Sequence, residues 1–123
     1  MNSAQRFLKS VNFAGRGIAK AWHDEPNFRW EIITAFIVIL SALLLKVDFI
    51  GVAVIILTCS MVIALELINT MIELISDVLK PRLDQYVKYI KDLTAAAVAV
   101  AAVGSIGVAL FLLLPPIINL LWQ

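Results

Sequence analysis

The sequence predicts an all-α membrane protein, with an amphipathic surface helix followed by three transmembrane helices. Two properties of the composition predict this class: 62% of the 123 residues are hydrophobic, and the mean hydropathy is +0.95. A soluble domain is usually about 45–50% apolar. Three long apolar runs, separated by short polar segments, are the third observation. The formal net charge of +1 gives no basic footprint for nucleic acid.

The N-terminal segment, residues 1–28, alternates basic and apolar side chains. The apolar ones at positions 7, 8, 11, 18 and 22 partly keep helical spacing, and basic ones stand at 6, 9, 16 and 20. This pattern predicts an amphipathic helix on the membrane surface, with its basic face toward lipid phosphates. Pro26 marks a break, and Asn27 is a candidate cap for the next helix.

The first two spans are predicted at about 29–46 and 49–79. Trp30 and Lys46 are typical interface anchors at the ends of the first span. The link between the spans is short, which predicts a tight hairpin. The second run is longer than a bilayer needs, so we expect its polar second half to project beyond the membrane until Pro81 breaks it.

Residues 80–92 are predicted to form a basic, polar loop, and the third span is predicted at about 93–122. The alanine-rich start of this span allows close helix packing in lipid. Pro115 and Pro116 are expected to end or kink it. Basic residues gather in 1–28 and 80–92, so the positive-inside rule places the N-terminus and the second loop in the cytoplasm. No signal peptide is expected, and a single cysteine, Cys59, excludes an internal disulfide.

Acidic and amide side chains interrupt the second span in a regular pattern. Glu66, Asn69, Glu73 and Asp77 follow i, i+3, i+7 and i+11, so they form one stripe on a helix. Ionisable groups in hydrocarbon cost several kcal/mol, about 2.5–3.5 kcal/mol for Asp on insertion scales. Such a stripe is expected to face a bundle interior or a functional site.

Further polar groups stand at the same predicted interface, before the first span and before the third. A set of carboxylates without a His or Cys cluster favours a hard cation such as Mg²⁺, which binds few protein oxygens together with substrate phosphates. Lys91 and Arg82 could neutralise phosphate charge. The combination indicates phosphoryl transfer at a membrane surface, without the Gly-rich P-loop of common nucleotide-binding folds.

These motifs resemble the prokaryotic diacylglycerol kinase and undecaprenol kinase family of small integral membrane lipid kinases. The match consists of E-x-N-F-R from Glu25 to Arg29, E-L-I-N-T-x-I-E from Glu66 to Glu73, and the K-D pair that precedes the alanine-rich span. The resemblance covers nearly the whole chain. It implies one lipid kinase domain over 1–123, a homotrimer with active sites shared between neighbouring subunits, and a place in the bacterial inner membrane.

The resemblance also implies roles for individual residues. Glu66 would be the catalytic base on the lipid hydroxyl, and Asn69 would position substrate and base. Glu25 and Glu73 would hold Mg²⁺ with the ATP phosphates. The family's remaining nucleotide contacts fall on Arg6, Phe13, Gly17, Asp77, Lys91 and Asp92, and Arg29 and Glu31 would sit near the point where the lipid enters.

Two departures from the family pattern concern the site. The family commonly has E-Y-H in the loop where this chain has Arg82, Leu83 and Asp84, and Met71 replaces a smaller residue. Within the family, the N-F-R and E-L-I-N-T forms favour undecaprenol over diacylglycerol as the substrate.

Other classes of function stay open from the residues alone. Glu66 could couple protons in a small transporter, or Glu66 and Asn69 could be hydrogen-bonding glue in a non-catalytic assembly subunit. Arg6, Lys9 and Arg16 could simply contact lipid headgroups. ATP-dependent transfer that is lost in Glu66→Gln would separate the kinase from both alternatives.

Overall fold

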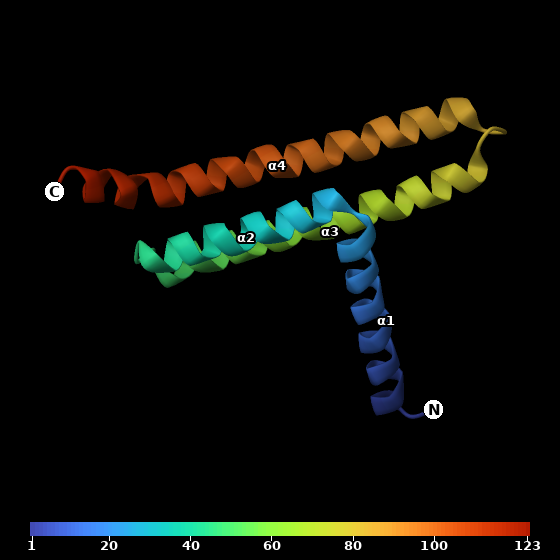
Figure 1. The fold of residues 1–123 in the computed structure, drawn as a ribbon, viewed down its shortest axis with the longest axis horizontal. Helices are drawn as coiled ribbons and strands as arrows, with labels where there is room; N and C mark the ends of the chain where they lie inside the picture. Colours follow the sequence, from blue (N-terminus) through green and yellow to red (C-terminus); the bar gives the residue numbers. More distant parts are fainter.

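The computed structural model describes residues 1–123 as four α-helices without a strand, which confirms the predicted fold class. Figure 1 shows α2, α3 and α4 running side by side, with α1 projecting steeply away from them. The connections are short. The helices are α1 (Ser3–Asp24), α2 (Pro26–Leu44), α3 (Phe49–Leu79) and α4 (Asp84–Leu121).

Helix α1 begins with a capping box that its sequence provides. The side chain of Asn2 accepts a hydrogen bond from the Gln5 amide at 2.9 Å, and the Gln5 side chain accepts one from the Asn2 amide at 3.1 Å. These bonds satisfy donors that a helix N-terminus otherwise leaves free. Along the rest of α1 only Ala21 is buried, so both its apolar and its basic faces remain available to a membrane surface.

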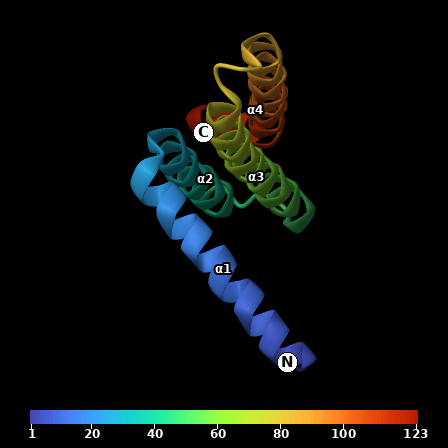
Figure 2. The same ribbon diagram turned by 90° about the vertical axis from the view of Figure 1, so that its right-hand side faces the viewer.

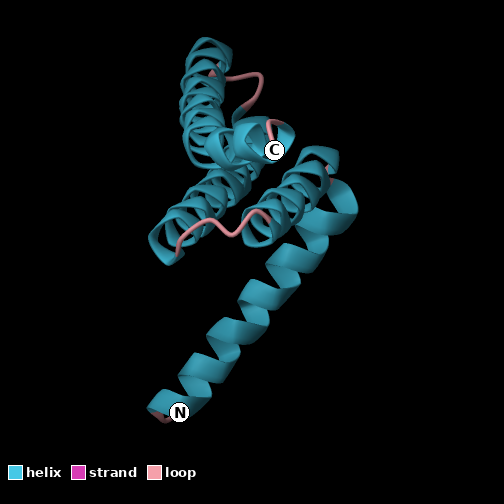
Figure 3. Cartoon of the chain, turned by 90° about the vertical axis from the view of Figure 1, so that its left-hand side faces the viewer, coloured by secondary structure: helices cyan, strands magenta, loops and turns pink.

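The joint between α1 and α2 is one residue long, and Figure 3 shows the two helices joined almost directly. Glu25 occupies the cap position of α2 and Pro26 is its first residue, where a missing amide proton costs nothing. The expectation that Asn27 caps this helix is therefore wrong. Arg29 turns back and donates to the carbonyls of Trp22 at 2.8 Å and His23 at 3.0 Å, satisfying two acceptors in the last turn of α1.

Three helices are long and apolar enough to cross a membrane: α2, α3 and α4. Figure 2 shows α3 between α2 and α4, and α3 makes most of the contacts with both. At 1.5 Å per residue, a helix of 31 residues such as α3 is about 46 Å long, against a hydrocarbon core of about 30 Å. The α3–α4 hairpin therefore extends beyond the hydrocarbon, and Figure 1 shows it reaching past the α1–α2 joint.

The segment predicted as a loop at 80–92 is mostly helical. Only Lys80–Leu83 connects the two helices, and α4 starts at Asp84, nine residues before the predicted span. Residues 84–92 lack Gly and Pro, and Val87 packs to 1% exposure. The burial of Val87 stabilises the helical conformation of this segment. At the other end, α4 continues through Pro115 and Pro116 to Leu121.

The interior of a single chain is small. Only 9 of 123 residues are buried, and large apolar side chains cover the outer faces of α2, α3 and α4. A helix that is hydrophobic all round belongs in lipid or against a partner. The exposed surface of the three helices is thus the surface expected of a membrane segment.

Candidate active site

A polar cavity of about 490 Å³ lies between the first turn of α2, the middle of α3 and the start of α4. It brings together five of the residues predicted from the sequence, namely Glu66, Asn69, Glu73, Lys91 and Asp92. The rest of the wall comes from Asn27, Ile72, Thr94, Ala95, Val98 and Ala99.

Helical spacing positions the polar groups on each wall. Glu66, Asn69 and Glu73 lie on one stripe of α3 because successive members are three or four residues apart. On α4, Lys91, Ala95 and Val98 share a face for the same reason. The small side chains of α4 leave space opposite the acidic stripe, so the cavity follows from the alanine-rich sequence.

Glu66 is the deepest charged residue, at 4% exposure. The carboxyl group of Glu31 on α2 lies beside it, and Glu73 and Glu25 lie within electrostatic range. Glu66 is therefore influenced by carboxyl groups from α2, from its cap and from α3. Such a concentration of negative charge is suited to cations and to proton transfer.

Two longer polar contacts connect the other predicted residues. The amide nitrogen of Asn69 donates to Glu73 Oε1 at 3.4 Å. Lys91 Nζ donates to Asp77 Oδ1, also at 3.4 Å, which ties α4 to α3 just outside the cavity. Lys91 thus places a positive charge beside the acidic stripe.

Glu25 and Glu73 were predicted to hold Mg²⁺. The structure contains no group of three or more His, Cys, Asp or Glu side chains that could hold a metal ion. Mg²⁺ needs only one or two carboxylates when substrate phosphates complete its shell. Glu25 makes no capping hydrogen bond with its side chain, and it lines the cavity between α1 and α3, whereas Glu73 lines the polar cavity.

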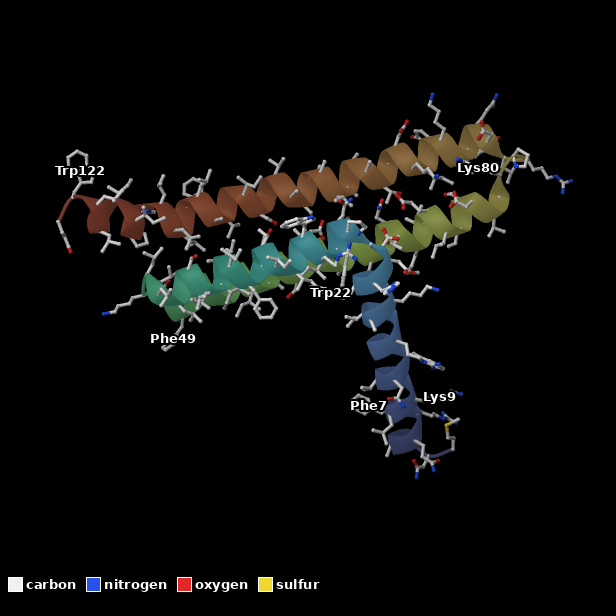
Figure 4. All side chains as sticks on the ribbon, viewed as in Figure 1. Phe7, Lys9, Trp22, Phe49, Lys80 and Trp122 are labelled. Carbon is white, nitrogen blue, oxygen red and sulfur yellow. The ribbon has the colours of Figure 1, made fainter.

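Some predicted residues lie elsewhere in the chain. Arg6 and Phe13 stand on α1, which Figure 4 shows leading away from the α3–α4 hairpin, with Phe7 and Lys9 labelled near its outer end. Lys9 and Arg16 stack on the Phe13 ring, 5.7 and 4.8 Å from its centre. Within one chain, α1 does not contribute these side chains to the polar cavity.

Gly17 lines a second cavity, of about 470 Å³, between α1 and α3, and Glu25 lies at its edge. A Cβ added to Gly17 would meet no atom within 4 Å, so nothing in the fold of one chain requires a glycine there. Arg29 is engaged with the α1 carbonyls, a structural role that the sequence did not indicate.

Sequence reasoning did not identify Asn27 and Thr94 as cavity residues. Thr94 lies one turn after Lys91, so its helical spacing was a usable signal. The position of Asn27 beside Pro26 favours a capping role, so the sequence gives no sign that it lines a cavity. The cavity therefore receives a polar group from the first turn of α2 that no motif pointed out.

Three helices long enough to cross a membrane, with a polar cavity between them, define the class of integral membrane proteins. The family model for prokaryotic diacylglycerol kinase matches residues 12–113. This chain belongs to that family, and it is a membrane lipid kinase.

The relatives of this chain are named either diacylglycerol kinase or undecaprenol kinase. The chain is 37% identical over 119 residues to a diacylglycerol kinase of Synechocystis sp., which covers 96% of this chain and 68% of that protein. It is 35% identical over 114 residues to an undecaprenol kinase of Bacillus subtilis, covering 93% of each chain. A diacylglycerol kinase of Escherichia coli is 27% identical over 101 residues, with 82% of this chain and 83% of that protein covered.

Proposed function

We propose that this protein transfers the γ-phosphate of ATP to the hydroxyl of undecaprenol, forming undecaprenyl phosphate at the cytoplasmic face of the bacterial inner membrane. The observation that carries the proposal is the polar cavity, which joins Glu66 and Glu73 to Lys91 at the end of the membrane helices. The similarity to an undecaprenol kinase along 93% of both chains supports the choice of lipid.

Glu66 acts as the base in this proposal. The lipid hydroxyl oxygen attacks the γ-phosphorus, the bond from that phosphorus to the ADP oxygen breaks, and the hydroxyl proton passes to the Glu66 carboxylate. The burial of Glu66 in the wall of the polar cavity supports this role. Asn69 holds the substrate and the base in position, from the next turn of α3.

The nucleotide occupies the outer part of the same cavity. Glu25 and Glu73 would hold Mg²⁺ together with its phosphates, and a bound ion would supply positive charge to offset theirs. Asp77, Lys91 and Asp92 line the nucleotide site. In a homotrimer with shared sites, Arg6, Phe13 and Gly17 on α1 would contact the nucleotide of a neighbouring subunit, which accounts for their distance from the cavity of their own chain.

A diacylglycerol kinase is the second candidate, and the 37% identity to the Synechocystis sp. diacylglycerol kinase supports it. Both lipids present a hydroxyl at the membrane surface, so the residues of the polar cavity serve either one. The two candidates differ only in the apolar part of the acceptor.

The test is transfer of labelled γ-phosphate from ATP with Mg²⁺, in mixed micelles that contain either undecaprenol or diacylglycerol. We expect label on undecaprenol, and none with the Glu66→Gln variant. Asp48→Asn is the matched control, because Asp48 caps the opposite end of α3 from the cavity. Asparagine can accept the same hydrogen bond, so this variant should retain activity. Label on diacylglycerol alone would select the second candidate, and no label on either lipid would overturn both.

A further inference from the structure

A second charged cavity lies at the turn of the α3–α4 hairpin, and Figure 4 labels Lys80 at this turn. The cavity has a volume of about 330 Å³. We call it the outer basic cavity, because three of the six residues that line it are lysines. These residues are Lys80, Asp84, Val87, Lys88, Lys91 and Asp92. None of the roles proposed above uses Lys80 or Lys88.

Two lysines of the outer basic cavity have no acidic partner. The ion pairs of the chain join His23 to Asp24 and Lys91 to Asp77, so Lys80 and Lys88 keep uncompensated positive charges. The carboxylate of Asp84 is at the first position of α4, where the positive end of the helix dipole offsets its charge. Lysine ammonium groups bind phosphate as point charges. The cavity is therefore suited to a phosphate group.

The position of the cavity favours a soluble anion over a lipid headgroup. Lys80 follows the last residue of α3, and the 31 residues of that helix exceed the roughly 20 that span a hydrocarbon core. On α4, the uncharged run begins at Leu93, beyond Lys88 in the chain. Both lysines thus lie on the solvent side of the membrane segment.

Lys91 connects the outer basic cavity to the polar cavity, because it lines both. Its Nζ lies 3.4 Å from Asp77 Oδ1, a long contact that leaves the ammonium group able to donate elsewhere. One ammonium group cannot serve a phosphate in each cavity equally well. An anion in the outer basic cavity would therefore compete with the polar cavity for Lys91.

We propose that the outer basic cavity is a second phosphate site, which binds the free phosphate ion through Lys80, Lys88 and Lys91. The bound ion draws Lys91 away from the polar cavity and so lowers the affinity of that cavity for the nucleotide. The binding site stands independently of the proposed function, whereas the effect on ATP rests on it.

Phosphate binding is measured by broadening of the ³¹P resonance of inorganic phosphate, with the full chain in a maltoside detergent and without Mg²⁺ or nucleotide. Loss of a hydrogen bond from a charged donor weakens binding by about tenfold or more. Lys88→Gln should therefore need about tenfold more phosphate for equal broadening, and Lys88→Arg much less than that. Lys46→Gln is the matched control, because Lys46 lies in the turn between α2 and α3. Equal broadening with wild type and Lys88→Gln at one ionic strength would overturn the site.

Kinetics test the competition for Lys91. Added phosphate should raise KM for ATP in the wild type with kcat unchanged, and chloride at the same ionic strength should not. Lys88→Gln should have the wild-type KM for ATP in the absence of phosphate and should lose the response to phosphate. A raised KM for ATP in Lys88→Gln without phosphate would place Lys88 in the nucleotide site and overturn the second site.

A lipid headgroup is tested by adding phosphatidylglycerol to the micelles. Unchanged broadening supports the free ion, whereas its loss would give the cavity to a headgroup and overturn the soluble source. Since binding is measured without nucleotide, the two proposals fail separately. Binding that depends on Lys88 without phosphate transfer would remove the proposed function and keep the phosphate site. Transfer without such binding would do the reverse.

Discussion

Glu66 combines burial and charge more strongly than any other residue of the chain. It is 4% exposed, and three other carboxyl groups lie within electrostatic range. Such an arrangement opposes folding unless a cation or a proton offsets it. Amide or hydroxyl side chains would join helices at a lower cost of burial than a carboxylate. The burial of a carboxyl group at this position therefore favours a catalytic role.

The first prediction at this scale is that Glu66→Gln loses activity while the fold is retained. Removing a general base typically costs at least about 100-fold in rate, and the amide has the same shape as the carboxyl. Turnover should fall by that factor, and the thermal midpoint in detergent should stay equal or rise. A variant that kept a tenth or more of wild-type turnover would exclude Glu66 as the base.

Arg29 supports a second prediction, because it fastens the end of α1 to α2. Arg29→Ala removes two hydrogen bonds to the carbonyls of Trp22 and His23. Since these bonds are exposed, we expect a modest cost of about 1 kcal/mol, seen as faster amide exchange in the last turn of α1. Arg29→Lys should retain part of the protection. Unchanged exchange in both variants would show that the joint does not depend on this side chain.

The N-terminus of α3 is stabilised by a side-chain cap. The Asp48 side chain accepts from the Gly51 amide at 3.1 Å. A Cβ at Gly51 would lie 2.6 Å from Val47 Cγ1 and 2.7 Å from that same Asp48 oxygen. Glycine is therefore required here by close approach, at the turn between the first two spans.

We predict that Gly51→Ala is more harmful than Asp48→Ala. Loss of the cap costs about 1 kcal/mol, while the added methyl group both displaces the cap and crowds Val47. Gly15→Ala is the control, because a Cβ there meets no atom within 4 Å and alanine favours the helix by up to about 1 kcal/mol. Thermal unfolding in one detergent should order the three variants accordingly.

The start of α4 gives a further prediction at the same scale. Because residues 84–92 are helical, their amides should exchange slowly, and those of Lys80–Leu83 quickly. Val87→Ala should weaken this protection, since it removes a side chain that is 1% exposed. Uniformly fast exchange over 80–92 would instead support a loop of the length expected from the sequence.

Over the whole molecule, the notable feature is the separation of α1 from the cavity that its residues are proposed to serve. Figure 1 shows α1 diverging from the three-helix segment. At the α1–α2 joint, Arg29 donates hydrogen bonds to two carbonyls of the last turn of α1. In the homotrimer that we propose, a first helix that diverges in this way would reach a neighbouring subunit.

We predict that two inactive variants complement each other when they are mixed. Co-expressed Arg6→Ala and Glu66→Gln chains should regain activity, because a mixed trimer contains some sites with both native residues. A mixture of Glu66→Gln and Glu73→Gln should regain none, because both residues line one cavity of one chain. Equal recovery in the two mixtures, or none in either, would exclude sharing between subunits.

The sequence by itself determined the fold class, the bounds of α3 and the polar stripe, because these depend on composition and on the period of one helix. It also identified five residues of the polar cavity, through spacing on α3 and the charged pair before the alanine-rich span. Each of these features is local to a single element.

Only the tertiary structure decided which side chains meet across helices. The proximity of Glu31 to Glu66, the presence of Asn27 and Thr94 in the cavity, and the turn of Arg29 toward α1 depend on how the helices pack. The same holds for the early start of α4, where burial of Val87 extends the helix past the predicted boundary. Periodicity sets the face on which a residue lies, whereas packing selects the partner opposite that face.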